Sequence, residues 1–192
     1  GEIMVGQSLF EPKRPVATNK NDRVLALTTN EVKADTQFGV TLKNIDLEVY
    51  QSEILGIGGV AGNGQEELMQ ILTGEKIDHS VSLKYMGNDI QILNPRERRE
   101  MGLAFAPEER LGHAAVANLN LLENSLITDS KKRFQKQMGF INFAELNLYT
   151  NKIIENFNVK TTGASALASS LSGGNLQKFV VGREIGQKPS LF

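Results

Sequence analysis

Two glycine-rich stretches carry the residue types that bind phosphate. The first, at residues 59–66 (GVAGNGQE), follows the spacing G-x-x-x-x-G-K-[S/T], with Gly59 and Gly64 in the two glycine positions. In such a loop, successive backbone N–H groups and the start of the next helix surround the phosphates, the lysine reaches the terminal oxygens and the hydroxyl binds Mg²⁺. Here Gln65 and Glu66 replace the last two residues, so only the backbone pattern matches.

These two replacements weaken the binding of a polyphosphate. Gln65 can donate hydrogen bonds but carries no charge, and losing a charge-assisted contact costs about 1.5 to 3 kcal/mol. Glu66 brings a negative charge near the phosphates, and this repulsion outweighs the ability of a carboxylate to bind Mg²⁺. Taken alone, the loop is compatible with a nucleotide site and with a glycine turn that binds nothing.

A dinucleotide-binding turn is a third interpretation of the same loop. Gly56, Gly58 and Ala61 fit the pattern G-x-G-x-x-A after an apolar, strand-like run. That pattern requires the helix to begin beside the third small residue and an acid at the end of the next strand. Here Asn63 and Gly64 lengthen the loop, and the nearest acid precedes the next strand-like run, so the match is weak.

The second glycine-rich stretch is LSGGNLQK at residues 171–178. Ser172 is a residue type that caps helices, and Gly173 and Gly174 would expose N–H groups at the start of the helix that follows. Any side chain at the two glycines would block an approaching ligand. The stretch therefore predicts either a receptor for a terminal phosphate or a simple helix cap.

LSGGNLQK resembles the signature sequence of ABC-transporter ATPases, in the variant found in importers of simple sugars and nucleosides. EILGIGGVAGNGQEEL (53–68) resembles the phosphate loop of the second ATPase half of tandem importers, in which the lysine is commonly missing. FAPEERLG (105–112) resembles their F/Y-x-P-E-[D/E]-R stretch, and IMVG (3–6) resembles the end of a preceding ATPase half. The resemblance covers nearly the whole chain.

The resemblance implies an α/β fold: a P-loop NTPase (ABC ATPase) core with an antiparallel β subdomain and an inserted helical subdomain, truncated before Walker B. Residues 1–23 would be a linker from a preceding ATPase half, and 24–110 the core with the β subdomain. Residues 111–170 would be the helical subdomain, and 171–192 the signature helix returning to the core. Walker B, the D-loop and the switch histidine would follow Phe192.

The resemblance also implies two unlike ATP sites between two ATPase halves. Four signature residues would complete the site of the partner half in trans: Ser172, Gly173, Gly174 and Asn175. The chain's own loop would form the degenerate site, where ATP binds weakly or not at all and Mg²⁺ is expected only in the partner's competent site. Its expected residues are Gly59, Gly62, Asn63, Gly64, Gln65 and Glu66, with Phe38 stacking on adenine or serving as a core residue.

The same resemblance assigns a membrane-facing role to the segment that follows the core. Ala106 stands where the Q-loop glutamine would be, so Glu108, Glu109 and Arg110 would sense the permease unless they form a solvated loop. The implied partners are the preceding ATPase half, membrane-spanning permease subunits and, indirectly, a substrate-binding protein. The implied location is cytoplasmic, peripheral on the inner face of the membrane.

Composition narrows the remaining functions. The 192 residues carry a net charge of -1, which gives no field that would recruit nucleic acid. There is no cysteine and there are two histidines, so we expect no metal site of the protein's own. No run approaches the roughly 18 apolar residues of a membrane span. The competing hypotheses are a scaffold module that binds no nucleotide and, less well supported, a dinucleotide-binding domain.

Periodicity and capping residues predict the elements that position these motifs. We expect an antiparallel pair at 24–33 and 39–50, a buried parallel strand at 53–60 and a helix at 64–74 ending at Gly74. A hairpin should turn at Gly87–Asn88, and a short strand should lie at 102–106. Between them a helix should begin after Asn94, with Glu97 as the acid of a capping box. Helices at 118–127, 142–157 and 172–186 complete the pattern.

Overall fold

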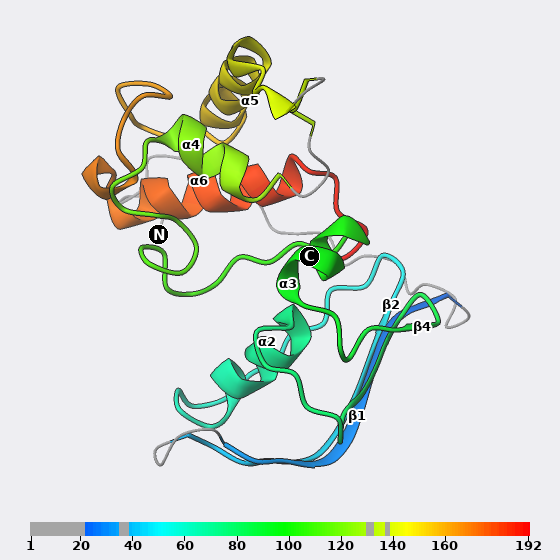
Figure 1. Cartoon of the computed structure of the whole chain (residues 1–192). Helices are drawn as coiled ribbons and strands as arrows, with labels where there is room; N and C mark the ends of the chain where they lie inside the picture. The colour runs from blue at the N-terminus through cyan, green and yellow to red at the C-terminus, as the bar shows by residue number, and fades with distance from the viewer. Residues whose placement is uncertain (1–21, 35–38, 130–132, 137–138) are drawn as a thin grey trace.

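The computed structural model describes residues 22–34, 39–129, 133–136 and 139–192. Its buried apolar side chains form two clusters, one drawn from residues 25–103 and the other from residues 114–180. In Figure 1 the curved sheet, α2 and α3 form the lower half, and α4, α5 and α6 form the upper half. The first cluster belongs to the lower half. The phosphate-loop stretch and the signature stretch therefore belong to different halves.

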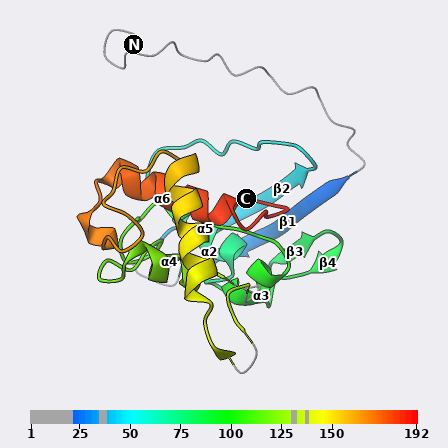
Figure 2. The ribbon, with the colours of Figure 1, turned by 90° about the horizontal axis from the view of Figure 1, so that it is seen from above.

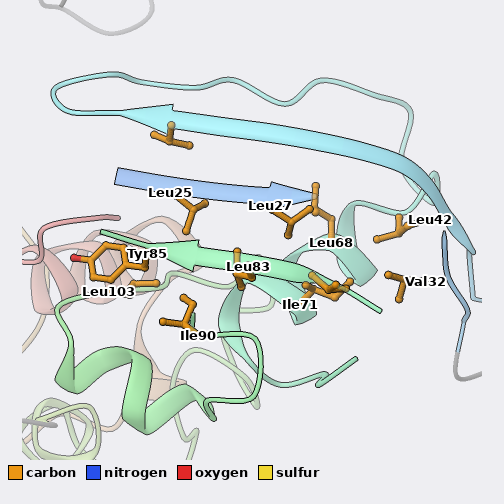
Figure 3. Close-up of a cluster of buried hydrophobic side chains, with 12 residues drawn as sticks. Leu25, Leu27, Val32, Leu42, Leu68, Ile71, Leu83, Tyr85, Ile90 and Leu103 are labelled. Atoms are coloured by element: carbon orange, nitrogen blue, oxygen red, sulfur yellow. The ribbon is translucent and has the colours of Figure 1, made fainter. Parts of the chain in front are cut away.

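The sheet has four strands in the order β2-β1-β3-β4, and every strand pairs antiparallel with its neighbour. The strands are β1 (Arg23–Val32), β2 (Leu42–Tyr50), β3 (Ser82–Tyr85) and β4 (Asn88–Asp89). The predicted antiparallel pair is confirmed, with Leu27 opposite Leu47 on one side and Leu83 on the other. Leu27 and Leu83 lie near Leu68 and Ile71 of α2, and Leu25 lies near Tyr85 and Leu103, as expected for a sheet with one buried face (Figure 3).

The hairpin between β3 and β4 turns one residue earlier than predicted. Tyr85 pairs with Asn88, so Met86 and Gly87 form the loop, with φ angles of 47° and 80°. Two consecutive positive φ angles are typical of the tight turn that matches strand twist. Asn88 belongs to the strand because its backbone pairs with Tyr85.

Helix α2 (Gln65–Thr73) is confirmed, and Gly74 ends it in the left-handed conformation. Helix α3 (Pro95–Glu100) begins with the predicted capping box, in which Asn94 and Glu97 bond each other's backbone N–H groups. The fully buried Arg98 donates from α3 to the carbonyl oxygens of Ile71 and Leu72, at the end of α2. Burial lowers the pKa of Arg98 to about 10. The arginine thus joins the two helices.

Two predicted strands are not formed as expected. Residues 53–60 are not a strand, and Ile54 and Val60 are 88% and 75% exposed. A buried parallel strand needs neighbours that bond its N–H and C=O groups, and no described strand pairs with this segment. Residues 102–106 form a single parallel bridge, between Leu103 and Leu191, and not a strand.

The upper half contains α4 (Leu121–Ile127), α5 (Phe143–Asn156), a short 3-10 helix η2 (Ala168–Ser170) and α6 (Gly173–Ile185). All three predicted α-helices of this half are confirmed. Helix α5 crosses α6 (Figure 2), where Gly182 lies against Phe157 and Ile153. A methyl group at Gly182 would stand 2.6 Å from Phe157 Cδ2, so the glycine permits the crossing. In the described part of the chain, no helix is long and apolar enough to cross a membrane.

Candidate functional site

The glycine loop reaches α2 through two left-handed glycines. Gly62 and Gly64 have φ angles of 86° and 99°, a conformation that other residues adopt only with strain. Gly64 is the N-cap of α2 and is buried, and a methyl group there would stand 2.7 Å from Leu42 Cδ2. The turn into the helix therefore has the backbone freedom and the close packing that a phosphate loop requires.

The side chain of Gln65 folds back across this loop. Its Nε2 donates to the carbonyl oxygen of Val60 at 3.0 Å, and its Oε1 accepts from the N–H of Asn63, also at 3.0 Å. A methyl group at Gly59 would stand 2.6 Å from the Gln65 Nε2, so the glycine leaves room for the amide. The N–H group of Asn63, in the loop, is thus already bonded to the Gln65 side chain.

Two carboxylates stand in the first turn of α2. Glu66 is exposed, with its Oε1 3.5 Å from the Gln70 Nε2, and Glu67 accepts from the backbone N–H of Val40 at 2.7 Å. Negative side chains stabilise the positive end of a helix, which is also the end where a phosphate would lie.

The signature stretch begins α6 in a way that differs from the expected cap. Ser172 is the N-cap residue, but its side chain accepts no hydrogen bond from the helix N–H groups. Its Oγ instead accepts from the Asn175 Nδ2 at 2.9 Å, while the Asn175 Oδ1 accepts from the N–H of Lys160 at 3.0 Å. Ser172 therefore occupies the expected N-cap position, but its side chain makes no capping hydrogen bond and bonds Asn175 instead.

The start of α6 is open. Ser172, Gly173 and Gly174 are all exposed, and a methyl group at Gly174 would meet nothing within 4 Å. The first N–H groups of a helix have no partner within it, and among the described residues no side chain caps them here. A methyl group at Gly173 would stand 3.1 Å from the Arg110 Nη1, so this guanidinium lies beside the opening.

A family model described as "ABC transporter" matches residues 42–192. The chain belongs to the ABC transporter ATP-binding family. It is 34% identical to the nucleoside import ATP-binding protein NupA of Lactococcus lactis subsp. cremoris, over 99% of this chain and 37% of that protein. It is also 34% identical to the guanosine import ATP-binding protein NupO of Bacillus subtilis, over 98% of this chain and 37% of that protein.

The ribose import ATP-binding protein RbsA of Clostridium tetani is 30% identical over 98% of this chain and 36% of that protein. The chain thus spans little more than a third of the length of these relatives.

Two solved ABC cassettes share its fold. MJ1267 in its ADP conformation gives a TM-score of 0.63 at 19% identity over 87% of this chain and 66% of that one. The dimeric cassette MJ0796 gives 0.67 at 17% identity, over 86% and 70%.

Within this ABC cassette, the segment expected to face a permease has two parts. Ala106 is half-buried and packs against the cluster of the upper half. Glu108, Glu109 and Arg110 are exposed on the loop that leads into that half, and the carbonyl oxygens of Glu109 and Arg110 accept from Ala114 and Ala115. The backbone of the loop is therefore fixed while its charged side chains stay accessible. Phe38 lies outside the described residues.

Sequence reasoning missed two relationships in this cassette. One is the contact of Arg110 with Gly173, for which no local pattern gives a signal. The other is a buried ionic network at the end of α6, in which Glu184 accepts from Arg183 and from Arg99 of α3. Arg183 also donates to the carbonyl oxygens of Asn124 and Ala114, and burial lowers its pKa. The signature helix is thereby joined to both halves.

A cavity of about 160 Å³ lies beside this network, where the two halves meet. Its lining includes Phe105, Pro107 and Arg183. His113 and Glu75 also line it, and the His113 Nε2 lies 2.7 Å from the Glu75 Oε1, so a residue just after α2 contacts the loop that opens the upper half. Polar contacts that line the cavity therefore join the two halves.

Proposed function

We propose that this cassette is the ATP-binding domain of an ABC importer for nucleosides or simple sugars. In this proposal its LSGGN stretch completes an ATP site whose phosphate loop belongs to a second ATPase domain. The open start of α6 carries the proposal, because uncapped N–H groups, two accessible glycines and a serine hydroxyl are donors suited to phosphate oxygens. The printed names of NupA, NupO and RbsA support the class of transported substrate.

The chemistry of the signature would be electrostatic. Phosphoryl transfer spreads negative charge over the oxygens of the transferred group, and fixed donors lower the barrier when they point at that charge. Gly173 and Gly174 would donate from the backbone and Ser172 from its hydroxyl, with Asn175 beside them. The lysine, the hydroxyl residue and the Mg²⁺ of this site would come with the partner domain.

The chain's own loop would be the idle site of the pair. Its residues do not fit a magnesium nucleotide, because the Gln65 amide already bonds Asn63 N–H and Val60 O, and Glu66 brings a charge of the wrong sign. We propose that ATP binds here weakly or not at all and that the loop serves as a scaffold. No step of hydrolysis is assigned to this loop.

The proposed assembly contains a preceding ATPase half of the same polypeptide and membrane-spanning permease subunits, with a substrate-binding protein acting through the permease. The length of the relatives beyond this chain leaves room for a second ATPase half. Glu108, Glu109 and Arg110, with Ala106 behind them, would face the permease, placing the cassette in the cytoplasm on the inner membrane face. The subdomain boundaries at 24–110, 111–170 and 171–192 are part of the same proposal.

The test uses the intact importer ATPase. Ser172→Arg should abolish ATP turnover, because the larger cation fills the space that the γ-phosphate would occupy. The matched control is Ser165→Arg, which places the same side chain at another exposed serine of the upper half. Unaltered hydrolysis by Ser172→Arg would rule out the signature as part of an ATP site.

A further inference from the structure

We infer that Asn175 is a positioning residue that sets the direction of the Ser172 hydroxyl, so that its hydrogen faces the phosphate of a nucleotide held by another domain. This inference rests on the proposed function of the signature. It starts from the bridge that Asn175 makes between Lys160 and Ser172, at the third residue of α6.

The orientation of the Asn175 amide is fixed by its partners. The backbone N–H of Lys160 can only donate, so the asparagine must present its oxygen to that group. The amide nitrogen, which can only donate, therefore faces the Ser172 Oγ at 2.9 Å. A flipped amide would place its NH₂ group against the Lys160 N–H, and two donors facing each other are unfavourable.

The orientation of the amide determines what the serine can do. A hydroxyl has one hydrogen and two lone pairs, and one lone pair of Ser172 already accepts from Asn175. The hydrogen cannot point back at the amide nitrogen, and within the described residues it donates to no acceptor. Because Ser172 is exposed, its hydrogen is available to a ligand at the start of α6, where Gly173 and Gly174 are exposed as well.

The anchor of the bridge is itself held in place. Lys160 follows Val159, which is 5% exposed and bonds the carbonyl oxygen of Ile154 through its N–H. The Lys178 Nζ donates to the carbonyl oxygen of Asn158 at 3.3 Å, so α6 contacts this segment twice. The segment that follows α5 therefore holds the Asn175 side chain, which in turn bonds Ser172.

The test compares three variants of the intact importer ATPase. In Asn175→Asp, the carboxylate still accepts from Lys160 N–H but can no longer donate, so the Ser172 hydroxyl turns inward and bonds it. We expect kcat to fall about tenfold with little change in KM, because one hydrogen bond to a charged group is lost. Asn175→Ala frees the hydroxyl to turn toward the phosphate and should lose only about two- to threefold.

Ser172→Ala separates hydroxyl direction from charge repulsion. If the aspartate acts through the hydroxyl, adding Asn175→Asp to Ser172→Ala should cause no further loss of kcat. A further tenfold loss in that background would assign the effect to repulsion and overturn the inference. A loss of kcat in Asn175→Ala equal to or larger than that in Asn175→Asp would also overturn the inference. A bridge with only a structural role is damaged most when both of its hydrogen bonds are removed.

Two controls complete the design. Asn147→Asp adds the same charge to an exposed position of α5 and should leave turnover unchanged. Thermal unfolding of each variant shows whether the fold is retained. Unchanged turnover in Ser172→Ala would contradict the proposed function itself, whereas reduced turnover in Ser172→Ala with normal turnover in Asn175→Asp would contradict only the role of Asn175.

Discussion

The Arg110 guanidinium lies beside Gly173, with its Nη1 3.1 Å from the position that a methyl group on the glycine would occupy. A cation at the N-terminus of a helix is opposed by the helix dipole, at about 0.3 to 1 kcal/mol. Among the described residues no carboxylate pairs with Arg110 to offset this cost. An anion bound at the start of α6 would contact both the guanidinium and the helix.

We therefore expect Arg110→Gln to lower kcat/KM for ATP about tenfold in the intact form of the proposed importer ATPase, because one hydrogen bond to a charged group is lost. The rate should also become less sensitive to salt, because the lost contact is ionic. Arg96→Gln is the matched control, since Arg96 is exposed and pairs with Glu100 on α3. Equal kinetics for wild type and Arg110→Gln at both low and high salt would exclude a role in ATP binding.

The glycine loop gives a prediction of recovered binding. Changing Gln65 to Lys and Glu66 to Ser releases the N–H of Asn63, adds a cation and removes the opposing charge. We expect the intact double variant to bind one more ATP analogue per chain than wild type, measured by equilibrium dialysis with Mg²⁺. Gln70→Lys adds the same charge farther along α2 and should leave the stoichiometry unchanged. An unchanged stoichiometry in the double variant would show that other features close the loop.

Two glycines of α6 should separate stability from function. Gly182→Ala places a methyl group 2.6 Å from Phe157 Cδ2 and should reduce the free energy of unfolding by about 1 to 3 kcal/mol, measured by urea denaturation. Gly174→Ala meets open space, so its stability should stay within about 0.5 kcal/mol of wild type while ATP turnover falls at least tenfold. Full turnover in Gly174→Ala would contradict an open phosphate receptor at α6.

The buried network at the end of α6 predicts a large loss of stability. Glu184→Gln leaves the buried Arg183 without its counter-charge, which should cost about 3 to 5 kcal/mol in the free energy of unfolding. Glu155→Gln, at an exposed position of α5, should change it by less than about 0.5 kcal/mol. A loss below 1 kcal/mol for Glu184→Gln would show that the network carries little of the contact between halves.

Local chemistry made part of the fold predictable. Asn94 with Glu97 marked the start of α3, and Gly74 marked the end of α2, because caps depend on residues within one turn. The β1–β2 pair was predictable because apolar and polar residues alternate along both strands, which is also a local pattern. The segment at 53–60 was predicted as a strand from its apolar composition, but composition does not supply the neighbours that a strand needs.

Part of the candidate site could likewise be predicted from local sequence, and part could not. The motifs at 59–66 and 171–178 could be found from spacing, and the structure places each at the start of a helix. The contact between Arg110 and Gly173 could not be found, because it depends on how the upper half packs against a loop distant in sequence. The role of Asn175 depended on Lys160, whose backbone is positioned by the buried Val159. Tertiary packing decides both.

The exposed segment before the glycine loop also affects how this chain can be handled. Residues 54–61 contain no charge and no proline, and Ile54, Ile57 and Val60 are each more than half exposed. Exposed apolar side chains that gather in one uncharged segment are typical sites where chains associate. Produced without a partner that covers this segment, the chain should form aggregates that increase with concentration, and a soluble preparation would require either that partner or a charged substitution at Ile54 or Val60.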